Sequence, residues 1–221
     1  MTGGEHDQTA RLQAALGYAA RGIAVLPTHF PVNAPTATGP VRCSCRRHAC
    51  PAPARHPLGG LRLDDASTGG LAIRRWWTVY PEAGVGAPTG WTFDSIRLRH
   101  PANSGAVLAW LARHDARTGP VLRCGAAHEF LVRPAGRGGF LMPLGQGELL
   151  YSGQGGLVLL APSRTADGGT VAWVRDLTLP LPDGDPLFET LLHIPDTDPD
   201  APGGDLPEPD PDTDTDSGPP G

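Results

Sequence analysis

The most constraining feature of this chain is a short segment in which three of its four cysteines fall within eight residues. Cys43, Cys45 and Cys50 are followed by His56, which gives the spacing C-x-C-x4-C-x5-H. The residues between them are mainly proline, alanine and arginine, which cannot build a hydrophobic core. Zinc prefers four sulfur and nitrogen ligands, and a bound ion would supply the folding energy that such a loop lacks. The sequence therefore predicts a closed, structural zinc site within residues 43–56.

Two alternatives bear on this site. The thiols could be a chance cluster of reduced cysteines, and His48 could replace His56 as the fourth ligand. We prefer His56 because His48 lies inside the loop between Cys45 and Cys50. Cysteines at this density in a cytosolic chain favour metal binding over disulfides. The fourth cysteine, Cys124, lies on a predicted apolar strand and is expected to be a buried free thiol.

Charge divides the chain into a body and a tail. Residues 195–221 contain eight Asp, one Glu, eight Pro and no Arg, a composition typical of disordered segments. The body keeps 14 acids against 18 Arg, so a chain of net charge −5 contains a domain of net charge +4. We expect a flexible N-terminus at 1–8, one domain at 9–194 and a disordered tail at 195–221.

The chain shows no sign of membrane insertion or export. No apolar run approaches the roughly 18 residues of a membrane span. The polar N-terminus lacks the charged-then-apolar pattern of a signal peptide. We therefore expect a cytoplasmic protein with no membrane partner.

Hydrophobic periodicity predicts an α+β fold, with helices and strands interleaved early and an antiparallel run of strands later. Helical spacing occurs at 8–21, 71–80, about 104–118 and about 186–193. Strand patterns, separated by glycine-rich turns, occur at 23–27, 83–90, 92–99, 120–124, 127–133, 138–142, 147–151, 156–161 and 170–175.

Several motifs, taken in order along the chain, are typical of one family. They are Gly22-Ile-Ala-Val-Leu-Pro27, the cysteine segment with His56-Pro57, Ile73-Arg-Arg-Trp-Trp77, Tyr80-Pro81, Gly84-Val-Gly-Ala-Pro-Thr-Gly90, Phe93-Asp94, Gly119-Pro-Val-Leu-Arg123 and Gly155-Gly-Leu-Val-Leu-Leu-Ala-Pro-Ser163. Over roughly residues 10–180 the chain resembles the bifunctional DNA primase/polymerase N-terminal domain of the archaeo-eukaryotic primase superfamily. The resemblance implies a central, mostly antiparallel sheet with an RRM-like half, flanked by helices, and nucleotide or nucleic-acid partners.

The resemblance also implies a chemistry that this chain does not match. Such domains add nucleotides on a template with two Mg²⁺ or Mn²⁺ ions, held by a D-x-D pair and a third carboxylate, beside a histidine near the phosphates. The acidic positions here hold Arg97, Arg99 and Leu150, whereas His128 matches the histidine. Fixed cations repel divalent metals. We therefore expect no catalytic Mg²⁺ or Mn²⁺ and no nucleotidyl transfer.

Three functions remain open. Arg97 and Arg99 share one face of a predicted strand and, beside His128, would form a phosphate or carboxylate site without metal, unless they are solvated residues of an eroded site. An active nucleotidyltransferase would need a rearranged site of Asp94, Glu148 and His128. The third function is a zinc-stapled module for an unknown protein partner. A +4 body is too weakly basic to require nucleic acid.

Overall fold

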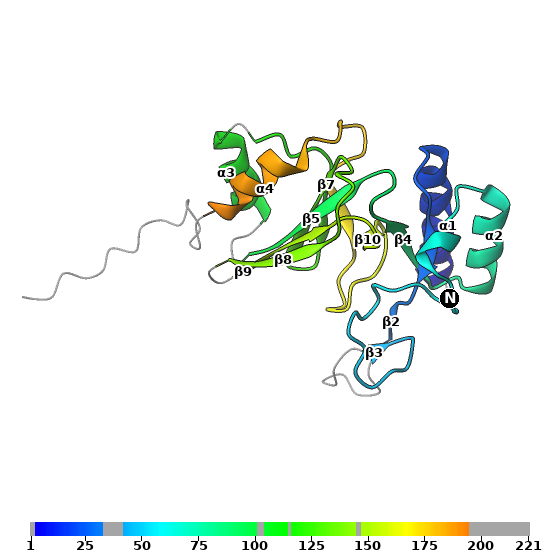
Figure 1. Ribbon diagram of the computed structural model, residues 1–221. Coiled ribbons are helices and arrows are strands. Elements are labelled where there is room, and N and C mark those ends of the chain that lie inside the picture. Colours follow the sequence, from blue (N-terminus) through cyan, green and yellow to red (C-terminus); the bar gives the residue numbers. More distant parts are fainter. Residues whose placement is uncertain (1–2, 33–41, 101–103, 115, 145–146, 195–221) are drawn as a thin grey trace, which may run out of the picture.

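The computed structural model of the chain describes residues 3–32, 42–100, 104–114, 116–144 and 147–194 (Figure 1). These residues form a three-stranded sheet, a six-stranded sheet and a small two-stranded sheet, with helices beside the two larger ones. Every strand pairing within these sheets is antiparallel.

The three-stranded sheet packs against the first two helices, which lie together at one end of the molecule in Figure 1. Its strand order is β1-β4-β10. The bounds are α1 (Gly3–Ala20), α2 (Gly70–Val79), β1 (Leu26–Thr28), β4 (Gly84–Pro88) and β10 (Leu157–Leu160).

Close backbone approach and aromatic packing hold this unit together. A Cβ atom at Gly84 would lie 2.5 Å from Thr28 Oγ1, so only glycine allows β1 and β4 to pair this closely. Tyr18 and Trp77 bury their rings in the core, and the Tyr18 hydroxyl donates a hydrogen bond to the Ala161 carbonyl at 2.7 Å. The hydroxyl thereby ties α1 to the chain that follows β10.

The six-stranded sheet has the order β11-β6-β7-β5-β9-β8. The two edge strands of this sheet are therefore β11 and β8. The bounds are β5 (Asp94–Arg99), β6 (Val121–Cys124), β7 (Ala127–Val132), β8 (Phe140–Leu144), β9 (Gly147–Ser152) and β11 (Ala172–Arg175).

The two faces of this sheet pack against different parts of the molecule. One face carries Ile96, Leu98 and Phe130 into a core shared with α3 (Ser104–Arg113) and α4 (Gly184–Leu192), which cover it in Figure 1. The other face places Leu122, Cys124 and Leu131 in the core of the three-stranded unit. Because side chains alternate along a strand, every polar residue of β5, β7 and β9 belongs to one of these two environments.

The predicted zinc segment follows the small sheet of β2 (Pro31–Val32) and β3 (Arg42–Cys43). It bends sharply at Arg46 and Ala54, which have left-handed φ angles of 62° and 63°. Non-glycine residues rarely adopt this conformation unless the surrounding structure holds them in it. A 3-10 turn, η1 (Leu63–Asp65), then leads to α2.

The fold class is confirmed as α+β with mostly antiparallel sheets, and each predicted helix and strand has a counterpart, although α3 ends at Arg113 and not near 118 and β1 begins at Leu26 and not at 23. The first helix differs, because α1 begins at Gly3 and includes residues that the sequence assigned to a flexible N-terminus at 1–8. The predicted tail at 195–221 lies outside the described residues. Within the described ranges, no helix combines the length and apolar character that crossing a bilayer requires.

Candidate functional site

Four potential metal ligands converge in the segment after β3. The ligand atoms of Cys43, Cys45, Cys50 and His56 all lie within 4.8 Å of one another. His56 Nε2 is 3.3 Å from Cys43 Sγ and 3.4 Å from Cys50 Sγ. His48 is exposed and does not belong to the cluster. Bond lengths of about 2.0–2.3 Å to a tetrahedral ion place neighbouring ligand atoms about 3.3–3.8 Å apart, so this cluster could hold a metal ion.

The surrounding residues orient these ligands. The backbone N–H of Ala54, at one of the left-handed bends, points to Cys43 Sγ at 3.5 Å. The His29 ring packs against the His56 ring in a tilted arrangement with centroids 4.3 Å apart, and the His29 backbone N–H donates to the His56 carbonyl at 3.0 Å. Burial and the neighbouring His56 lower the pKa of His29 to about 4. Burial also lowers the pKa of His56, which favours the neutral imidazole that a metal ligand needs.

The strand register brings the three expected acidic positions together. Arg97 lies opposite Leu150 of β9, and Arg99 lies opposite Glu148. On its other side, Arg97 faces Glu129 of β7. Because directly opposed residues share a face of the sheet, these five side chains belong to one surface. We call Arg55, Arg97, Arg99, Glu129 and Glu148 the arginine–glutamate centre, since Arg55 reaches the same surface from the cysteine segment.

Both carboxylates of this centre are already paired with arginine. Arg55 Nη2 donates to Glu129 Oε2 at 2.9 Å, and the Ser95 hydroxyl donates to Glu129 Oε1 at 2.8 Å. The Glu129 side chain is fully buried. Arg99 Nη1 lies 3.2 Å from Glu148 Oε1 in a more exposed pair. Glu129, buried with both oxygens engaged, has little capacity left for a divalent cation, whereas the exposed Arg99–Glu148 pair holds its carboxylate only weakly.

Arg97 is the member of the centre with unsatisfied hydrogen-bonding capacity. Its Nε is buried and has no hydrogen-bond partner among the described residues. Burial and then the neighbouring Arg55 lower the pKa of Arg97 below its ordinary value. For Arg55, burial acts to lower the pKa, but the adjacent Glu129 carboxylate raises it overall. An anion bound beside Arg97 would relieve both the missing hydrogen bond and the repulsion between the two arginines.

His128 does not join Arg97 and Arg99, contrary to the sequence prediction. It lies opposite Leu98 of β5 and Arg123 of β6, and therefore on the face covered by α3 and α4. The ring is buried, and neither ring nitrogen has a hydrogen-bond partner among the described residues. Burial, followed by the charge of Arg123, lowers the pKa of His128. A shift of one residue in register would have put it beside the arginines.

The acids of the alternative catalytic site are also separated. Asp94 alternates with Ile96 and Leu98 and lies on the same face as His128, whereas Glu148 lies on the opposite face with Arg99. Asp94 is buried, and its Oδ2 accepts hydrogen bonds from the Tyr151 hydroxyl at 2.5 Å and from the Ala135 N–H at 2.8 Å. Burial and this contact raise the pKa of Tyr151 to about 12. Asp94 thus anchors the chain that follows β7.

Sequence reasoning missed Arg55 and the pairing of Glu129. Because side chains alternate along β7, Glu129 and His128 point to opposite faces of the sheet, but the sequence does not show which of these two residues lies opposite Arg97. Arg55 and Glu129 are 74 residues apart, so no local pattern links them. Cys124, predicted as a buried free thiol, is free and buried, and burial raises its pKa to about 12.

Comparison with known proteins adds one finding to this geometry. The family model Prim-Pol, described as bifunctional DNA primase/polymerase, N-terminal, matches residues 15–186. The match spans both larger sheets, the cysteine segment and the arginine–glutamate centre. No curated protein matches the chain.

Proposed function

The chain belongs to the bifunctional DNA primase/polymerase N-terminal family, and from this premise we propose a function without catalysis. We propose that the domain binds phosphate groups of a nucleotide or nucleic acid at the arginine–glutamate centre and performs no nucleotidyl transfer. The observation that carries this proposal is the register of β5 with β9, which sets Arg97 and Arg99 beside Leu150 and Glu148.

The charges of the arginine–glutamate centre oppose the binding of catalytic metal ions. Two-metal nucleotidyl transfer needs several carboxylates free to bind Mg²⁺ or Mn²⁺. Here Glu129 and Glu148 are held by Arg55 and Arg99. A divalent ion about 6 Å from one guanidinium is opposed by about 5 kcal/mol at an effective dielectric near 20. These charges favour exclusion of catalytic metals from this surface.

The guanidinium groups of Arg97 and Arg99 have donors that could bind phosphate. Guanidinium groups form bidentate, charge-assisted hydrogen bonds with phosphate oxygens. Arg97 has a buried Nε without a partner among the described residues, and Arg99 is more than half exposed. Two residues apart on one strand, they present their donors on one face. Phosphate bound there would occupy the region where the family resemblance places the metal ions.

A rearranged catalytic site is the less favoured alternative. It would require Asp94, Glu148 and His128 to meet at one metal. The register puts Glu148 on one face of the sheet and the other two on the opposite face. Asp94 also uses Oδ2 to hold Tyr151 and Ala135.

For the cysteine segment we propose zinc as the resident metal. Three thiolates and one imidazole form the soft donor set that zinc takes in closed structural sites. The loop packs on the central sheet through Arg55, the residue directly before His56, so the metal would also position a member of the arginine–glutamate centre. Zinc would supply folding energy here and no chemistry.

Two measurements on the full chain test the main proposal. Primer extension with dNTPs and either Mg²⁺ or Mn²⁺ should show no template-dependent product. Fluorescence anisotropy with labelled single-stranded DNA should show binding that weakens roughly tenfold or more in Arg97→Gln/Arg99→Gln, because two charge-assisted contacts are lost.

The matched control is Arg123→Gln, an exposed arginine on the other face of the same sheet, which should leave DNA affinity nearly unchanged. Metal-dependent extension that disappears in Glu148→Ala would overturn the proposal in favour of the rearranged site. DNA binding that is equal in the double variant and the control would overturn the phosphate-binding role.

A further inference from the structure

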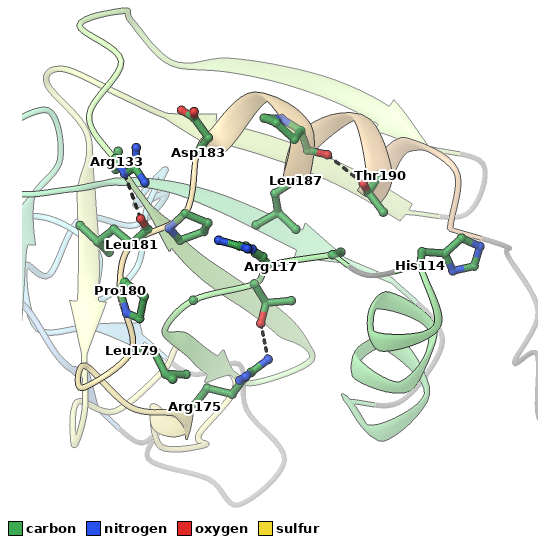
Figure 2. A pocket seen from close by; sticks show the side chains of 15 residues that line it. His114, Arg117, Arg133, Arg175, Leu179, Pro180, Leu181, Asp183, Leu187 and Thr190 are labelled. Carbon is green, nitrogen blue, oxygen red and sulfur yellow. Dashed lines mark hydrogen bonds between the residues drawn. The ribbon is translucent and has the colours of Figure 1, made fainter.

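A cavity of about 950 Å³ lies away from the arginine–glutamate centre, at the end of the large sheet where β6 begins and β7 ends (Figure 2). Its walls come from the connection between α3 and β6, the ends of β7 and β11, and the segment that leads into α4. The lining residues that carry the argument are Arg117, Arg133, Arg175, Leu181, Asp183 and Leu187.

Three arginines from three separate segments converge on this cavity. Arg133 Nε donates to the Leu181 carbonyl at 3.1 Å, and Arg175 Nη1 donates to Thr118 Oγ1 at 2.7 Å. Each contact uses one nitrogen and leaves the other donors of that guanidinium available. Arg117 is exposed, lies in the middle of the cavity in Figure 2, and has no hydrogen-bond or ion-pair partner among the described residues.

The charge of the cavity is not balanced from within. Asp183 is the one acid among its described lining residues, against the three arginines. In Figure 2 the Asp183 side chain lies near Arg133, whereas Arg117 and Arg175 lie farther from it. Converging guanidinium groups with spare donors are the arrangement that recognises phosphate oxygens.

A rigid apolar wall lies directly beside these arginines, since Arg133 Nε donates to the Leu181 carbonyl and Leu179 lies near Arg175 in Figure 2. It consists of leucine and proline side chains, and proline has a fixed φ angle. At Gly119, whose φ is +59°, a Cβ atom would lie 2.4 Å from Pro182 Cδ, so the backbone packs directly against this wall. A wall that needs no ordering on binding contributes affinity by lowering the entropic cost. The apolar wall residues are Leu179, Pro180, Leu181, Pro182, Pro186 and Leu187.

We propose that this cavity binds a nucleoside phosphate, with the phosphates at Arg117, Arg133 and Arg175 and the base against the leucine–proline wall. The volume falls within the range of about 300–1,000 Å³ that small-molecule sites occupy. The ligand must be both anionic and partly apolar, because guanidinium groups and apolar side chains line the cavity together. The proposal does not depend on the proposed function, since the cavity shares no residue with the arginine–glutamate centre.

The test uses isothermal titration calorimetry on the full chain carrying Arg97→Gln/Arg99→Gln, so that binding at the arginine–glutamate centre does not contribute. ATP should bind this background. Adenosine and inorganic triphosphate should each bind at least roughly tenfold more weakly, because each lacks one half of the recognised chemistry. Titration with a 5′-phosphorylated oligonucleotide tests whether the bound phosphate belongs to a free nucleotide or to the end of a nucleic-acid strand.

Adding Arg117→Gln should weaken ATP binding by roughly tenfold, the loss expected for one charge-assisted contact. This variant removes no described hydrogen bond of the folded chain, so misfolding does not confuse the result. Arg123→Gln in the same background is the matched control and should have no effect. Failure of ATP to bind, or equal affinity with and without Arg117→Gln, would overturn the proposal. If the unmodified chain binds ATP and the Arg97→Gln/Arg99→Gln chain does not, the ATP site is the arginine–glutamate centre and not this cavity.

Discussion

The cysteine segment and the arginine–glutamate centre both gather groups that bind cations in proteins, yet they differ in how those groups are satisfied. In the segment, the ligand atoms of three cysteines and one histidine lie within 4.8 Å of one another. In the centre, Glu129 and Glu148 face guanidinium groups at 2.9 and 3.2 Å. The segment could therefore hold a metal ion, whereas we propose that the centre binds an anion.

This difference shows that ligand identity alone does not make a metal site. A carboxylate binds Mg²⁺ less readily when a guanidinium already compensates its charge, and the compensation here comes from residues distant in sequence. Arg55 joins the two regions, because it follows the cysteines and pairs with Glu129 across 74 positions. The order of the metal segment and the charge balance of the centre should thus depend on each other.

The largest expected effect comes from removing a cysteine ligand. Cys50→Ser should abolish binding of about one equivalent of zinc and lower the thermal midpoint by roughly 10 °C, since each kcal/mol shifts the midpoint of a chain of this size by about 2–4 °C. Elemental analysis and thermal unfolding measure the two changes. His48→Gln, at the exposed histidine outside the cluster, is the control and should retain metal and midpoint. Metal loss in that control would show that His48 is the fourth ligand.

The next effect concerns the buried ion pair. Glu129→Gln should cost about 3–5 kcal/mol of unfolding free energy, because it leaves Arg55 buried without its counter-charge. Urea unfolding measures the loss. The double variant Arg55→Met/Glu129→Leu should recover most of it, since removing both charges also removes their desolvation cost. A double variant no more stable than Glu129→Gln would show that the cost is one of packing and not of charge.

A smaller effect is expected at His128, and it should depend on pH. Burial lowers the pKa of this histidine, so the folded chain keeps it neutral while the unfolded chain takes up a proton below its ordinary value of about 6.5. The unmodified protein therefore loses stability as pH falls from about 6.5 through the lowered pKa. His128→Leu should be within about 1 kcal/mol of the unmodified protein at pH 7.5, because the ring nitrogens have no described partner.

The advantage of His128→Leu over the unmodified protein should then grow as the pH falls, which urea unfolding at a series of pH values measures. The difference between the two chains removes contributions from other histidines. DNA affinity should not change, since His128 lies on the face opposite Arg97. A large loss of DNA binding would place the histidine in the phosphate site after all.

The smallest expected change in stability comes from breaking the exposed Arg99–Glu148 ion pair. Glu148→Gln should change unfolding free energy by less than about 1 kcal/mol, because the pair is partly solvated and screened. Freed from its carboxylate, Arg99 should bind phosphate more strongly, so DNA affinity should rise slightly at low salt. Anisotropy at two salt concentrations measures this change. A fall in DNA affinity would contradict the competition between Glu148 and phosphate for Arg99.

Much of the fold was predictable because its signals are local. Alternation in 127–133 and helical spacing in 71–80 predicted β7 and α2, and the cysteine spacing predicted the ligand cluster without any knowledge of the sheets. The family resemblance predicted that positions 97, 99 and 150 would be neighbours, and the β5–β9 register places them side by side. The extent of α1 was underestimated because its first turn, from Gly3, has no apolar residue.

The amino-acid sequence alone determined that this chain has a cysteine–histidine cluster and that arginines occupy the expected acidic positions, since both follow from residue type and short spacing. Only the tertiary structure decided which face of the sheet each residue occupies, because strand pairing sets the register and a shift of one residue exchanges the faces. That register separates His128 from Arg97 and brings Glu129 to Arg55. The cavity of Arg117, Arg133 and Arg175 likewise exists only because three distant segments meet at the end of one sheet.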